Sequence, residues 1–73
     1  MREEEKICLA EVCERLQKQM QYEDPWHAME VLLYGWCKKR RHSANWLSDM
    51  KRRGWMSRDM ARDFAQYCGD MYV

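Results

Sequence analysis

Apolar residues recur every three or four positions through most of the chain, a spacing that predicts helices. Over residues 2–21 these positions make one stripe, and charged and amide side chains occupy the opposite face. The stripe consists of Leu9, Val12, Cys13, Leu16 and Met20. Acidic residues near the start suit the positive end of a helix dipole. We therefore predict an amphipathic helix over residues 2–21, with Ile7 lying off its main stripe.

A second helix is predicted over residues 25–40, after the clear boundary at Asp24 and Pro25. The carboxylate of Asp24 can cap the first free amides, and proline fits the first helical position. Apolar residues surround almost the whole circumference of this helix. That pattern is typical of a helix at the centre of a bundle or at an interface, so both interpretations stay open. Gly35 either permits close approach of another helix or is simply tolerated.

Two shorter helices are predicted after it, over residues 44–53 and 58–68. Capping serines precede them and glycines end them: Ser43 and Gly54 for the first, Ser57 and Gly69 for the second. The chain shows no alternating strand pattern and no internal repeat. The predicted fold class is all-α, a single-domain bundle of about four helices that covers residues 1–73.

Aromatic residues and methionine are unusually frequent in this composition. The 73 residues include four Trp, four Tyr, one Phe and seven Met, which argues against a disordered chain. A buried aromatic side chain hides roughly 150–250 Å² of surface, and a small domain has limited interior for so many. We expect most of them in the core. Trp55, in the turn before the last helix, is the best candidate for a partly exposed indole.

The sequence offers no feature that would place the chain in a membrane or direct its secretion. No apolar stretch approaches the roughly 18 residues of a membrane-spanning helix, and the first residues lack the basic start and apolar run of a secretory signal. We therefore expect no membrane partner and a cytoplasmic location.

Catalytic and metal-binding motifs are also missing from the sequence. The four Cys, at positions 8, 13, 37 and 68, form no Cys-x-x-Cys pair, and His27 and His42 are isolated. We therefore expect no metal, no cofactor, and reduced cysteines that act as small hydrophobic side chains. No glycine-rich phosphate loop or nucleophile elbow occurs either. The sequence predicts a protein that is not an enzyme.

Basic residues concentrate between residues 38 and 53. Seven basic side chains and one carboxylate, Asp49, give this segment a local charge of +6 in a chain of total charge +1. The basic residues are Lys38, Lys39, Arg40, Arg41, Lys51, Arg52 and Arg53. Trp55 and Met56 follow directly, and Trp, Met and Arg are enriched in the cores of protein interfaces. Together these nine residues are the predicted partner-binding patch.

The leading hypothesis is a small interaction module that docks this patch on a partner protein, with homodimer formation through residues 25–40 as an option. The small size suggests a regulator or inhibitor encoded by a phage or another mobile element. In a simpler interpretation, Lys38 to Arg41 only stabilise and solvate a helix end.

The alternative hypothesis is a nucleic-acid-binding protein that contacts the phosphate backbone through residues 38–53. Its candidate residues are Lys38, Lys39, Arg40, Arg41, Arg58 and Arg62. A helix-turn-helix that reads bases is disfavoured, because Asp49 and Asp63 fall where apolar packing residues are expected. Acids also alternate with Arg58 and Arg62 on the last helix, where they would repel phosphates.

Overall fold

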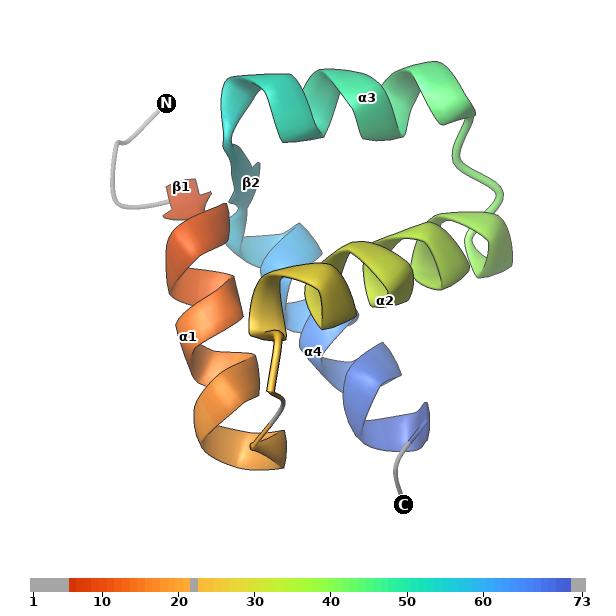
Figure 1. Cartoon of the computed structure of the whole chain (residues 1–73). Helices are drawn as coiled ribbons and strands as arrows, with labels where there is room; N and C mark the ends of the chain where they lie inside the picture. Colours follow the sequence, from red (N-terminus) through yellow and green to blue (C-terminus); the bar gives the residue numbers. More distant parts are fainter. Residues whose placement is uncertain (1–5, 22, 72–73) are drawn as a thin grey trace.

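The computed structural model describes residues 6–21 and 23–71. Within these residues, four helices and two short strands follow one another along the chain (Figure 1). Their order is β1 (Lys6–Cys8), α1 (Leu9–Met20), α2 (Pro25–Lys39), α3 (Ala44–Arg53), β2 (Trp55–Ser57) and α4 (Arg58–Met71). The predicted all-α fold class and the four helices are confirmed. The predicted start of the first helix at residue 2 falls on residues 1–5, outside the described residues.

The strand pair is the feature that the hydrophobic pattern did not predict. β1 and β2 pair in antiparallel register, with Ile7 opposite Met56. Each strand has only three residues, too few for an alternating pattern, and each leads directly into a helix. The helical prediction for residues 6–8 was therefore wrong. Ile7 is buried as a strand residue, which explains why it lay off the helical stripe.

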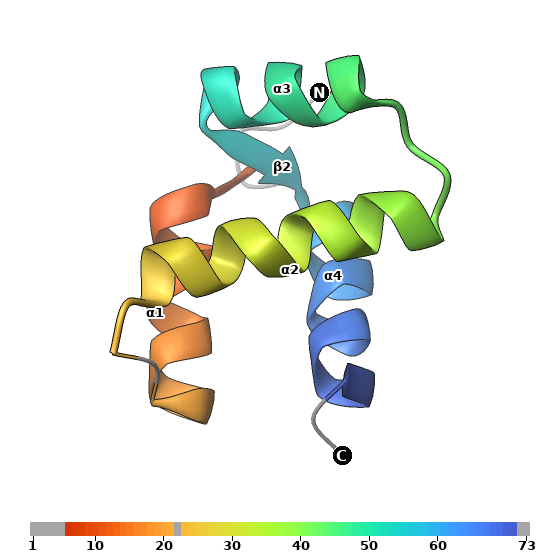
Figure 2. The same cartoon turned by 45° about the vertical axis from the view of Figure 1, so that its right-hand side comes forward.

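α2 is the central helix, and it contacts α1, α3 and α4 (Figures 1 and 2). Asp24 caps it as predicted, because its carboxylate accepts a hydrogen bond from the His27 backbone N–H at 3.1 Å. One side of α2 is completely buried and includes Met29, Leu33 and Trp36. The central position of α2 explains its buried apolar residues, whereas Trp26, Val31 and Tyr34 remain exposed.

Gly35 and Gly54 have different roles, and the structure decides between the two alternatives left open for Gly35. A Cβ atom at Gly35 would lie 2.5 Å from the hydroxyl oxygen of Tyr67, so this glycine permits close approach of α4 to α2. Gly54 adopts a left-handed φ of 81° and ends α3. α4, in contrast, continues past Gly69 to Met71, so its predicted end at residue 68 was wrong. A glycine inside a helix costs up to about 1 kcal/mol and does not by itself end it.

Cysteines take two different environments. Cys37 and Cys68 are buried in the core, as expected of small hydrophobic side chains, whereas Cys8 is exposed and Cys13 is partly exposed. All four are free thiols. Across the described part of the chain, no helix is long and apolar enough to cross a bilayer.

Candidate functional site

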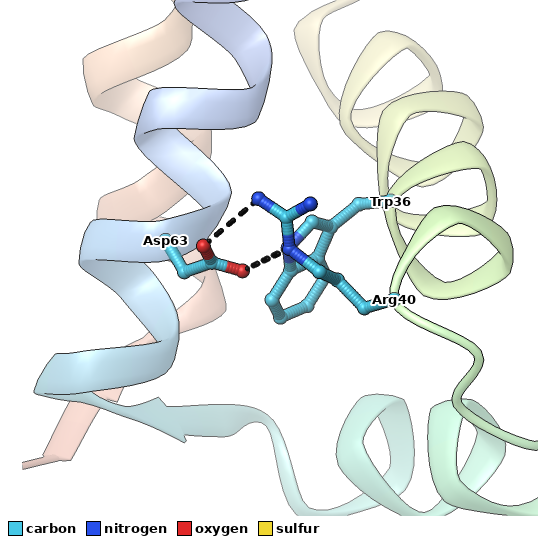
Figure 3. Close-up of polar contacts among 3 residues, drawn as sticks. All are labelled: Trp36, Arg40 and Asp63. Carbon is cyan, nitrogen blue, oxygen red and sulfur yellow. Dashed lines mark hydrogen bonds and ion pairs between the residues drawn. The ribbon is translucent and has the colours of Figure 1, made fainter.

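A carboxylate on α4 binds Trp36 of α2 and Arg40, the residue that directly follows α2 (Figure 3). Asp63 accepts hydrogen bonds from the Trp36 indole Nε1 at 2.7 Å and from Arg40 Nε and Nη2 at 2.9 and 3.0 Å. The hydrogen bonds from Arg40, and then that from Trp36, lower the pKa of Asp63 to about 2. The guanidinium group of Arg40, which was predicted as part of the basic patch, therefore binds a carboxylate of its own chain.

The predicted basic patch is divided between two ends of the molecule. α3 runs antiparallel to α2, so Lys38 to Arg41 lie where α3 begins and Lys51 to Arg53 lie where it ends (Figure 1). The ten residues of α3 place these groups about 15 Å apart at 1.5 Å per residue. The basic residues predicted as one corner over residues 38–53 therefore form two groups, because the chain reverses between them.

Several basic side chains of the predicted patch have partners within the fold. Lys51 pairs with Glu30 at 3.2 Å and Arg52 pairs with Asp49 at 3.0 Å. The ammonium group of Lys38 lies 5.5 Å from the centre of the Tyr34 ring. These contacts reduce the positive charge that is available to a ligand.

The two apolar residues of the predicted patch differ in exposure. Trp55 is half-buried, whereas Met56 is fully buried at 0% exposure. Met56 faces the core because alternate residues of a strand point to opposite sides, so its prediction as a partner-contacting residue is wrong. The indole of Trp55 makes cation–π contacts with two residues of the same chain. The guanidinium group of Arg53 lies 4.5 Å and the ammonium group of Lys6 lies 4.8 Å from the ring centre.

Arg58 and Arg62, from the nucleic-acid alternative, line a groove with a third arginine, Arg15 of α1. The groove has a volume of about 490 Å³, and its remaining lining consists of Ile7, Ala61 and Ala65. We call it the arginine groove. Sequence spacing could not reveal it, because Arg15 lies far from Arg58 along the chain and comes near it only when α1 and α4 flank the same hollow. Arg15 also forms an ion pair with Glu11.

Three large hydrophobic side chains of α2 are exposed, and two of them, Val31 and Tyr34, share one side of the helix. Trp26, Val31 and Tyr34 are 47%, 57% and 59% exposed. One continuous exposed stripe runs along the helix at intervals of three and four residues, and we call it the α2 face. It consists of Asp24, His27, Val31, Tyr34 and Lys38. The sequence shows these apolar residues, but it has apolar residues on almost every side of the helix, so it does not indicate which side the other helices leave exposed.

A hollow of about 180 Å³ adjoins one end of the α2 face. Tyr34, Cys37 and Lys38 line it from α2, and Leu47 lines it from α3. The last turn of α2 is thus bordered by a depression, whereas the first turn carries the protruding indole of Trp26.

Metal-ligating side chains do not gather in the described ranges 6–21 and 23–71, where no group of three or more comes together. Comparisons of the chain with protein-family models, curated proteins and solved structures find no match. The protein is therefore classified by its own architecture, a small all-α bundle joined by a short strand pair.

Proposed function

We propose that this protein is a non-enzymatic interaction module that binds a partner protein through the α2 face. The observation that carries the proposal is the exposure of Val31 and Tyr34, at 57% and 59%, on one side of α2. Large apolar side chains gathered on a surface mark sites of protein interaction, and Trp and Tyr contribute strongly to binding energy there.

The rigidity of α2 supports the same proposal. Its buried side packs against the other three helices, so the exposed side chains stand on a fixed support. A preorganised surface loses less conformational freedom on binding than a flexible one. A regulator or inhibitor, the role suggested by the small size, would act by covering a surface of its target with this face.

The α2 face supports partner binding better than the patch predicted around Trp55. Met56 is in the core, and Trp55 is engaged by Arg53 and Lys6. Tyr34 and Val31, in contrast, offer most of their surface to solvent. The most favourable target is an apolar strip with an acidic group opposite Lys38 and a basic group opposite Asp24, because such charges complement the two ends of the face.

Affinity capture with matched baits tests the proposal. The wild-type protein is compared with the double variant Val31→Glu/Tyr34→Glu, which places two carboxylates on the α2 face. The control is Gln17→Glu/Gln66→Glu, which adds the same charge at exposed positions of α1 and α4. A partner from the native host should be retained by the wild type and the control and lost by the first variant, with unchanged helical circular dichroism. Retention by all three baits would show that the α2 face is not the binding site.

Nucleic-acid binding is a second candidate function, and the arginine groove is the observation that favours it. Three guanidinium groups around one hollow suit phosphate oxygens. Fluorescence anisotropy with labelled DNA and RNA should then show binding that falls steeply with salt. Arg15→Ala/Arg62→Ala should reduce the salt slope, whereas the control Arg52→Ala should not. An absence of binding at low salt would reject this function.

A further inference from the structure

We infer that the α2 face binds a second copy of this chain, with the two α2 helices antiparallel. This inference rests on the proposed function, because it uses the same face and names its partner. The opposite charges at the two ends of the face and the exposed apolar side chains at its middle support self-pairing.

The five residues of the α2 face form a seam along one side of the helix. Asp24, Val31 and Lys38 are separated by seven residues, and His27 and Tyr34 lie between them at intervals of three and four. Val31 and Tyr34 supply the apolar surface at its middle, and Asp24 and Lys38 supply opposite charges at its two ends. All five residues except Val31 carry a polar group, so the seam resembles a specific surface contact more than a buried core.

The charges at the two ends of the seam determine its direction. When Val31 of one copy lies opposite Val31 of the other in an antiparallel pair, Lys38 of each copy lies opposite Asp24 of the other. Twofold symmetry then forms this opposite-charge contact twice. A parallel pair would place Lys38 against Lys38 and Asp24 against Asp24, and like charges repel. The antiparallel direction also sets each helix dipole against the opposite end of its neighbour.

The contacts that Asp24 and Lys38 make within the chain are compatible with this pairing. Asp24 uses Oδ1 to cap the helix through the His27 N–H, so its other carboxylate oxygen can accept from Lys38 of the second copy. The Lys38 ammonium lies above the Tyr34 ring, at the exposed surface of the face.

Sedimentation equilibrium over a concentration series that reaches the millimolar range tests the inference with the full chain. The wild type should show a monomer–dimer equilibrium. Lys38→Glu should weaken the dimer by roughly tenfold or more, because it sets two like charges against each other at both ends. Asp24→Lys/Lys38→Glu, which exchanges the charges, should restore the dimer. A parallel pair would keep its like-charge contacts in that double variant.

Two further variants keep the test decisive. Lys18→Glu makes the same charge change on the exposed side of α1 and should leave the dimer unchanged. If replacement of the capping Asp24 by lysine unfolds α2, as judged by circular dichroism, Asp24→Asn retains a cap and should weaken the dimer by removing one charge. Val31→Glu, at the centre of the seam, should abolish it.

The outcomes separate the inference from the proposed function. A monomer at every concentration, or a dimer insensitive to Lys38→Glu and Val31→Glu, would overturn self-pairing. The capture experiment would still decide whether the α2 face binds a different protein. A dimer that responds as expected, together with a capture result independent of the face, would support the inference and reject the use of this face for another partner.

Discussion

The carboxylate of Asp63 is the hydrogen-bond acceptor for the buried indole of Trp36, with 2.7 Å between Oδ2 and Nε1. Trp36 is completely buried, and its N–H would cost free energy without a partner. The same carboxylate holds Arg40 at the end of α2 (Figure 3). Asp63, an acid at a position where a helix-turn-helix would need an apolar residue, is thus the polar link between α2 and α4.

Removal of this link should destabilise the fold. Asp63→Ala leaves the Trp36 N–H buried without an acceptor, and we expect the free energy of unfolding to fall by about 2 kcal/mol. Asp49→Ala is the control, because Asp49 pairs with Arg52 on the exposed surface of the same helix and should change stability by less than about 0.5 kcal/mol. Urea denaturation measures both. Equal losses in the two variants would contradict the role of Asp63.

The stabilising effect of Asp63 should disappear in acid. Its pKa is about 2 in the folded protein against an ordinary value of 3.8, so the unfolded chain binds the proton first as the pH falls. The contribution is therefore complete above pH 3.8 and is lost as the pH falls through about 2. The side chain of Asp63 is 34% exposed, so solvent screening limits the effect to about 1 kcal/mol.

Comparison of the wild type with Asp63→Asn over this pH range isolates the effect. The difference in their free energy of unfolding should be constant from neutral pH to pH 3.8 and shrink below it. A difference that stays constant down to pH 2 would show that the carboxylate of Asp63 is not the titrating group.

The contact between Gly35 and Tyr67 predicts that the effect of Gly35→Ala on stability depends on the residue at position 67. Gly35→Ala places a Cβ 2.5 Å from the Tyr67 hydroxyl oxygen, so it should destabilise the wild type. In a Tyr67→Phe background the nearest ring carbon is 3.6 Å away, an ordinary contact. There Gly35→Ala should stabilise the protein by up to about 1 kcal/mol, the helix preference of alanine. A double-mutant cycle measured by thermal unfolding tests this change of sign, and two equal effects would contradict it.

Local signals in the sequence accounted for the helices. These signals are the spacing of apolar residues at three and four positions, the caps Asp24 and Ser43, and the left-handed Gly54. Each acts within one or two helical turns, so it can be recognised from the sequence alone. The strand pair is different, because Ile7 and Met56 meet only through long-range packing. Three-residue strands have no periodicity of their own, and no local pattern marks them.

The candidate surfaces were less predictable for the same reason. Charges adjacent in sequence, Lys38 to Arg41 and Lys51 to Arg53, are separated because α3 reverses the chain direction. Arg15 and Arg62 meet at one groove although they belong to different ends of the chain. Exposure of Val31 and Tyr34 depends on which side of α2 the other helices cover, and that is a property of the assembled bundle.

Thiol reactivity should follow the two cysteine environments. Burial raises the pKa of Cys68 to about 11 and also raises that of Cys37, so both hold little reactive thiolate near neutral pH. Cys8 is exposed and should react first with an alkylating reagent. Mass spectrometry of the labelled protein should find Cys37 and Cys68 modified only when urea unfolds the chain. Labelling of Cys68 as fast as Cys8 under native conditions would contradict its burial.

Gly54 connects the end of α3 to the start of α1 through a backbone hydrogen bond. Its φ of 81° disfavours residues with a Cβ, and its carbonyl accepts a hydrogen bond from the Leu9 N–H at 2.9 Å. Open space surrounds the position, so backbone strain rather than a clash determines the cost of substitution.

Gly54→Ala should reduce stability by about 1 kcal/mol and Gly54→Val by more, whereas Gly54→Asn should cost least because asparagine tolerates this conformation. Gly69→Ala, which also meets open space but lies within α4, should be neutral or stabilising. Thermal unfolding measures the stability of the three variants Gly54→Ala, Gly54→Asn and Gly69→Ala. Equal stabilities would show that strain in the left-handed conformation is not the reason for glycine at position 54.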